Sequence, residues 1–278
     1  MEIDVNTQFD DNKELEQMIK ALESQEKVRR AGYVDVRGNI SLSREDECVG
    51  DNNEINFSLN HVMEYYIYEY YFKPDAGVKC TEHPYARYFR EYGDLCMERE
   101  RFKAAEAAYK DAICWNPVDL DSILALAECY RALNMLERYM IVTRQAYRYC
   151  CTRATMARYY RNMGYYYTQK YKPEVARACY IYSNIYFHTE NADNELAYIE
   201  KAVGNKTPDL GIKQMQEVFA DYEIEPGPDP DTIGIIYRVG ELMLEDKQYG
   251  LARDCFSICY DITQEQALEE LLDELEGM

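Results

Sequence analysis

The sequence predicts an all-α protein in which antiparallel helix pairs stack side by side into a solenoid. Three observations lead to this fold class. Apolar residues recur at helical spacing over most of the 278-residue chain. A segment with the same order of small and aromatic residues returns several times between positions 86 and 263. Short breaks, several of them containing Pro or Gly, separate the copies, as expected between consecutive helices.

The first clear copy covers positions 86–117 and reads ARYFREYGDLCMERERFKAAEAAYKDAICWNP. In its two predicted helices, Gly93 lets the helices approach closely, Ala105 keeps the opposing surface flat, and Tyr109 fills the gap. Pro117 has no backbone N–H and suits a turn or the first position of the next helix. This order of residues resembles the tetratricopeptide repeat.

The resemblance extends over further copies at the family's period of about 34 residues. Gly164 and Gly240 stand in the place of Gly93 in two strong copies, and Ala127 stands there in a weaker one. The third copy is displaced by a short insertion. The resemblance implies a right-handed superhelix, and it divides the chain into repeats at 86–119, 120–153, 157–190, 191–225 and 233–266, the fourth of them degenerate.

Helical patterns also predict the elements around the strong copies. The degenerate copy predicts helices at 191–203 and 209–222, and the Pro-rich run at 226–230 predicts a stiff linker. Residues 264–278 repeat Leu at helical spacing with acidic residues outward, as in a terminal capping helix.

Residues 1–85 are predicted to form a mostly helical N-terminal extension, which resembles no family. Amphipathic patterns predict helices at 12–30 and 55–72. Between them, residues 33–43 alternate like a short β-hairpin about Arg37-Gly38-Asn39.

Composition excludes several classes of function. The net charge of −20 opposes binding to nucleic acid or to anionic lipid, because both require clustered Lys and Arg. No apolar run is long enough to span a bilayer, and the N-terminus does not resemble a secretory signal, which together predict a cytoplasmic protein. The ten cysteines include no C-x-x-C pair, so we expect reduced, packed thiols and no metal site.

No catalytic constellation is recognisable in the sequence. His61, His83 and His188 are isolated from one another, and no phosphate-binding glycine loop or nucleophile motif occurs. The 28 tyrosines are better explained by packing at large-residue positions than by ligand binding. We therefore predict a protein that is not an enzyme and that has no cofactor.

The resemblance implies a concave groove lined by the first helix of each repeat. Charge is segregated along the chain, since residues 86–187 hold 16 Lys and Arg against 11 Asp and Glu, whereas residues 188–278 hold 6 against 22. A basic middle favours an acidic ligand, because Arg pairs well with carboxylates. Equally, these arginines could pair with their own neighbours or with an acidic segment of the chain. The candidate groove residues are Arg87, Arg90, Arg131, Arg158, Arg161, Tyr165 and Tyr237.

The sequence thus predicts a scaffold or adaptor that binds a peptide or partner segment, with an acidic one favoured. One alternative is a peptide-sensing regulatory protein without a DNA-binding output, similar to the repeat-containing regulators of Gram-positive bacteria. Another is a structural protein that self-associates as a homo-oligomer.

Overall fold

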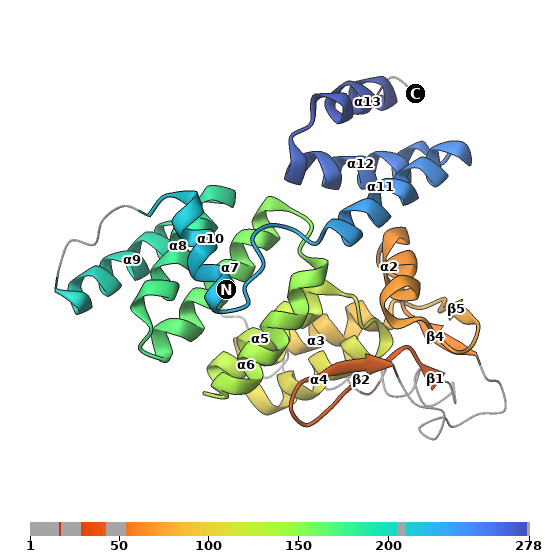
Figure 1. Ribbon diagram of the computed structural model, residues 1–278. Coiled ribbons are helices and arrows are strands. Elements are labelled where there is room, and N and C mark those ends of the chain that lie inside the picture. The colour runs from red at the N-terminus through yellow and green to blue at the C-terminus, as the bar shows by residue number, and fades with distance from the viewer. Residues whose placement is uncertain (1–16, 18–28, 43–53, 205–209, 277–278) are drawn as a thin grey trace, which may run out of the picture. The chain divides into compact units, whose positions relative to one another are not determined.

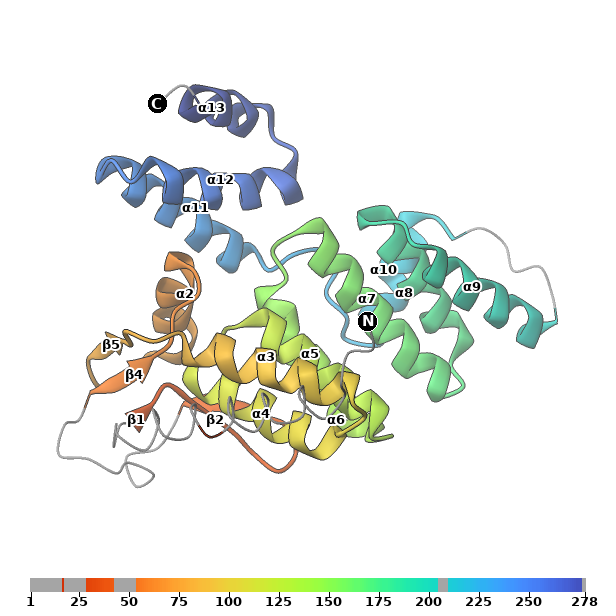
Figure 2. The same cartoon turned by 180° about the vertical axis from the view of Figure 1, so that it is seen from behind.

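The computed structural model describes residues 17, 29–42, 54–204 and 210–276, and Figures 1 and 2 show it from two opposite sides. The chain folds as two compact units, Met1–Val142 and Thr143–Met278, called here the N-terminal and the C-terminal unit. Each unit is described by itself.

The N-terminal unit contains two small groups of strands. Strands β1 (Arg29–Arg30), β4 (Ile55–Phe57) and β5 (Val78–Cys80) form a parallel sheet in the order β1-β4-β5. Strands β2 (Gly32–Val34) and β3 (Ile40–Leu42) form an antiparallel pair in which Tyr33 lies opposite Ser41. The predicted β-hairpin is therefore confirmed.

The predicted helix over residues 55–72 is wrong in its first part. Helix α2 covers only Val62–Phe72, while Ile55 and Phe57 belong to β4 and are fully buried on one side of it. Their alternation with Asn56 has the period of two that a strand requires. Helix α2 then begins at a capping box, in which the Glu64 side chain accepts a hydrogen bond from the backbone N–H of His61.

The predicted helix over residues 12–30 lies almost entirely outside the described residues. Its last two residues, Arg29–Arg30, form β1 and pair with β4, so the helix does not extend to residue 30.

Four repeat helices follow, of which three lie in the N-terminal unit and the fourth begins there. They are α3 (Tyr85–Glu98), α4 (Phe102–Trp115), α5 (Leu120–Ala132) and α6 (Leu136–Ala146), and the boundary between the two units falls within α6. Helices α3 and α4 pack against each other, and α4 also contacts α5 and β2 (Figure 1). Trp115, fully buried at the end of α4, stacks on the Tyr85 ring at 4.5 Å.

In the C-terminal unit α7 packs on α8 and α11 packs on α12, and α13 contacts α12 (Figure 2). Both helices of the degenerate copy, α9 and α10, are formed as predicted, and both contact α8. The capping helix is also formed. The elements are η2 (Tyr147–Tyr149), α7 (Arg153–Gln169), α8 (Pro173–Tyr186), α9 (Glu190–Val203), α10 (Ile212–Asp221), α11 (Pro230–Glu245), α12 (Tyr249–Thr263) and α13 (Gln266–Glu276).

Four of the helix pairs share one type of turn. Three residues connect the helices, and the central one lies in the left-handed region: Glu100, Asn134, Tyr171 and Lys247, with φ of 57°, 60°, 55° and 61°. In each turn the next residue donates its backbone N–H to a carbonyl five positions earlier, at 2.8–3.0 Å. Glu100 and Asn134 are 34 positions apart, whereas Asn134 and Tyr171 are 37 apart, which matches the short insertion predicted before the third copy.

Glycine permits close contact within three of these pairs. A Cβ atom on Gly93 would lie 2.5 Å from the Tyr109 ring, and one on Gly240 would lie 2.8 Å from the Phe256 ring. Gly164 stands in the same relation to Tyr180, at 2.9 Å. The predicted packing of antiparallel helix pairs across a glycine is therefore confirmed in these three pairs.

Candidate functional site

Two of the predicted groove arginines in the N-terminal unit pair with acids on their own helices. Arg87 on α3 lies 3.7 Å from Glu91, and Arg131 on α5 lies 2.7 Å from Glu128. Both pairs are at least partly exposed, so each contributes little to stability. Their charges are nevertheless neutralised by acidic neighbours on the same helix, which is the alternative to ligand binding that the sequence left open.

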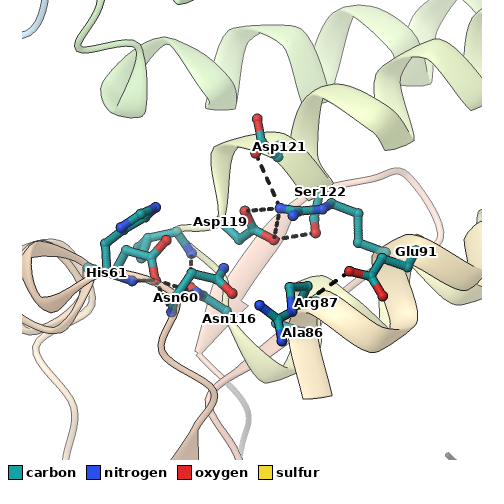
Figure 3. A network of polar contacts seen from close by, with 12 residues as sticks. Asn60, His61, Ala86, Arg87, Glu91, Asn116, Asp119, Asp121 and Ser122 are labelled. Atoms are coloured by element: carbon teal, nitrogen blue, oxygen red, sulfur yellow. Dashed lines mark hydrogen bonds and ion pairs between the residues drawn. The ribbon is translucent and has the colours of Figure 1, made fainter. Parts of the chain in front are cut away.

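Arg90 connects two helices of the same unit. Its guanidinium Nη1 lies 3.3 Å from a carboxylate oxygen of both Asp119 and Asp121 at the start of α5. Figure 3 labels the two aspartates and Ser122. Asp119 is almost completely buried and also accepts a hydrogen bond from the Ser122 hydroxyl. Because a buried charge needs a partner, the main role of Arg90 is to neutralise Asp119.

A second buried carboxyl group, that of Glu64, joins α2 to the repeats. Its Oε2 atom accepts hydrogen bonds from the Asn60 backbone N–H and from Asn116 Nδ2, both at 2.8 Å. Burial raises the pKa of Glu64, and the nearby Asp119 raises it further. Burial likewise raises the pKa of Asp119. The network in Figure 3 therefore holds elements together, and the sequence did not reveal it.

The arginines on α7 in the C-terminal unit differ from those three. Arg158 and Arg161 are half-buried and one helical turn apart. Among the residues that the structure describes, neither has a carboxylate within ion-pair distance. Arg161 donates a long hydrogen bond from Nη1 to the Phe187 carbonyl oxygen at 3.5 Å. Burial lowers the pKa of Arg161, and the adjacent Arg158 lowers it further.

Three other arginines of the C-terminal unit have acceptors, which for two of them are backbone carbonyl groups. Arg144 donates to two backbone carbonyl groups at 3.0 Å, and Arg153 donates from Nε to the Tyr186 carbonyl oxygen at 3.0 Å. Arg238 pairs with Glu241 at 2.8 Å. The structure thus leaves Arg158 and Arg161 as adjacent cations that no acidic side chain of the described chain neutralises.

The two predicted tyrosines lie on different helices. Tyr165 is half-buried on α7, four positions after Arg161 and seven after Arg158, so the three share one face of the helix. Tyr237 lies on α11, is 42% exposed, and meets the Phe256 ring edge-on at 5.6 Å. The predicted residues therefore include one cluster, formed by Arg158, Arg161 and Tyr165 on α7.

The described part of the chain offers few features for other chemistry. It holds no group of three or more His, Cys, Asp or Glu side chains placed to bind a metal ion. None of its helices is long and apolar enough to cross a membrane.

Comparison with known proteins adds one resemblance. No protein-family model matches the chain, and no curated protein matches it. Among solved structures, one similar chain is YrrB, described as a TPR protein with an unusual peptide-binding site. The match has 14% sequence identity and a TM-score of 0.37, and it covers 68% of this chain and 92% of YrrB. By its own turns and helix contacts, the described chain consists largely of antiparallel helix pairs.

Proposed function

We propose that this protein is a non-catalytic cytoplasmic scaffold that binds an acidic segment of a partner protein through α7. One observation carries the proposal: Arg158 and Arg161 lie side by side, half-buried, without a carboxylate among the described residues. Two like charges at this spacing repel each other, and partial burial strengthens that repulsion. A bound carboxylate would remove it and would form charge-assisted hydrogen bonds with both guanidinium groups.

The other groove arginines have a smaller part in this proposal. Arg87, Arg90 and Arg131 already pair with acids, so a ligand would have to displace an existing partner to reach them. Tyr165, on the same face of α7 as the two arginines, supplies a rigid aromatic surface next to the charged groups.

The test is capture of partners by the full chain, with wild type compared to Arg158→Glu/Arg161→Glu. Bound proteins are identified by mass spectrometry, and the affinity of each captured acidic segment is then measured by fluorescence anisotropy. We expect the double variant to lose at least about tenfold in affinity, since it removes charge-assisted hydrogen bonds and adds like charges. Binding should also weaken as salt is added.

Arg238→Glu is the matched control, because it reverses an exposed arginine of the same unit that lies outside the cluster. Circular dichroism must show the same helix content for all three proteins. Equal affinity of wild type and the double variant for every acidic segment would refute the assignment to α7.

A further inference from the structure

Specific contacts from α6, from α7 and from the turn after α7 bind the connection between α10 and α11. It comprises residues 222–227, called here the strap, and it appears in blue between α10 and α11 in Figure 1. Arg144 donates from Nη2 to the Tyr222 carbonyl oxygen and from Nη1 to the Glu223 carbonyl oxygen, both at 3.0 Å. One planar guanidinium thus binds two consecutive peptide groups of an irregular segment.

Tyr160 binds the second half of the strap. Its hydroxyl donates to the Glu225 carbonyl oxygen at 2.7 Å and accepts from the Gly227 backbone N–H at 2.8 Å. The Tyr160 ring is fully buried and stacks on Phe219 at 5.6 Å and on Tyr186 at 5.8 Å. Because the ring is fully buried and stacked on neighbouring rings, its hydroxyl is held in position before any segment binds to it.

Two side chains anchor the strap, at positions two residues apart. The Tyr222 ring meets Tyr167 edge-on at 5.1 Å and lies 4.7 Å below the Lys172 ammonium group. Ile224 is only 3% exposed. The side chains of Glu223 and Glu225 are exposed, and among the residues that the structure describes no hydrogen bond or ion pair involves their carboxylates. The recognition therefore uses an aromatic ring, an aliphatic side chain and main-chain groups.

These are the elements by which proteins bind extended peptides: hydrogen bonds to the main chain and pockets for alternate side chains. We propose that the surface formed by Arg144, Tyr160, Tyr167 and Lys172 is a peptide-recognition site that the strap occupies in cis. Its ligand in trans is an extended segment of a partner protein with an aromatic residue two positions before an aliphatic one. This site is separate from the Arg158–Arg161 cluster, and the proposal does not depend on that cluster.

The covalent connection makes the strap a strong competitor for its own site. A tethered ligand acts at an effective concentration of about millimolar, so a partner segment must bind better than the strap to replace it. Gly227 has a φ of +118°, which glycine adopts without steric strain, so the strap reaches the Tyr160 hydroxyl at little conformational cost. A partner segment without glycine at this position must end before it or take another backbone conformation there.

Displacement of the strap from its site also concerns the helix that follows it, α11. The strap leads directly into α11, where Thr232 donates to the Arg148 carbonyl oxygen at 2.6 Å. A further contact of the α11–α12 pair, the hydrogen bond from the Arg153 backbone N–H to Asp261 at 2.6 Å, does not involve the strap. Binding in trans would therefore release the strap from its contacts with Arg144 and Tyr160 while these two hydrogen bonds of the pair remain.

The test uses a fluorescent peptide of residues 221–228 and the full-length chain. In one variant, residues 222–227 are replaced by Gly-Ser-Gly-Ser-Gly-Ser, which keeps the chain length and removes the cis ligand. We expect this variant to bind the peptide at least about tenfold more tightly than wild type does. Adding Tyr160→Phe should weaken binding about fivefold, because two main-chain hydrogen bonds are lost. A peptide with Ile224→Ser is the matched control ligand and should bind more weakly.

No binding by a strap-replaced variant that keeps its helix content would overturn the proposal. A second measurement covers the case in which that variant does not fold. In wild type, an excess of unlabelled peptide should speed hydrogen exchange at the Gly227 amide, which the strap contact protects. Exchange that does not respond to the peptide would show that the strap is a fixed connection and not an exchangeable ligand.

Discussion

Two alanine substitutions in α11 compare a crowded position with an open one on the same helix. A Cβ on Gly240 would lie 2.8 Å from Phe256 Cε1, whereas a Cβ on Gly234 would meet nothing within 4 Å. Replacing glycine by alanine inside a helix stabilises it by up to about 1 kcal/mol, and this gain applies at both positions. The difference between the two variants therefore isolates the energy of the contact with Phe256.

The magnitude follows from how little room the ring has. Phe256 is 1% exposed and contacts Tyr237, so it cannot move away without disturbing the α11–α12 pair. Overpacking of this kind costs about 1–3 kcal/mol. We expect Gly234→Ala to stabilise the pair by up to about 1 kcal/mol and Gly240→Ala to change its stability by about 0 to −2 kcal/mol.

Native-state hydrogen exchange of the amides in α11 and α12 measures this local stability without requiring two-state unfolding of the whole chain. The expected difference of about 1–3 kcal/mol corresponds to roughly 5- to 150-fold in protection. If the two variants agree within about 0.5 kcal/mol, the close approach of α11 to α12 does not depend on glycine and the packing argument is refuted.

Two further predictions concern carboxylates that accept hydrogen bonds from backbone N–H groups. Burial and the nearby Asp119 raise the pKa of Glu64, so Glu64 keeps its proton to a higher pH in the folded protein than in the unfolded chain. The contribution of Glu64 to the free energy of unfolding is therefore fully present below about pH 4.3, the usual pKa of glutamate. This contribution is lost as the pH rises through the pKa of Glu64 in the folded protein. Glu64→Gln should flatten this decline in urea unfolding monitored by Trp115 fluorescence, and parallel pH profiles of variant and wild type would contradict it. Asp261 accepts a hydrogen bond from the Arg153 backbone N–H at 2.6 Å, so Asp261→Ala should destabilise the first turn of α7 by about 1–2 kcal/mol. Hydrogen exchange at the Arg153 amide measures this change, with the exposed Asp254→Ala on the same helix as a control that should leave it unaltered.

The repeats could be predicted from the sequence because their signals are local. Gly93 and Tyr109 are 16 positions apart, and the same spacing separates Gly240 from Phe256, so one helix pair contains the whole pattern. The strand at Ile55–Phe57 was missed since a short apolar run does not distinguish strand from helix, and its partners lie far along the chain.

The candidate site could be predicted only in part, because partners distant in sequence decide which arginines are neutralised. Arg90 and Arg158 look alike as basic residues on first helices of repeats. The structure places Asp119 beside Arg90 and no acidic residue of the described chain beside Arg158. The Pro-rich linker was anticipated, but its binding to Tyr160 joins residues 65 or more positions apart, which no local pattern encodes.

The shared turn also bears on how such repeats diverge. Glutamate, asparagine, tyrosine and lysine occupy its central position in the four helix pairs, yet all four adopt the same left-handed conformation. The backbone hydrogen bonds and the packing of the helices on either side impose that conformation, and no side chain at the position is required for it. The residue at the central turn position can therefore vary while the backbone conformation of the turn stays the same. In this chain the positive φ of the central turn residue marks each of these helix pairs, whereas the identity of that residue does not.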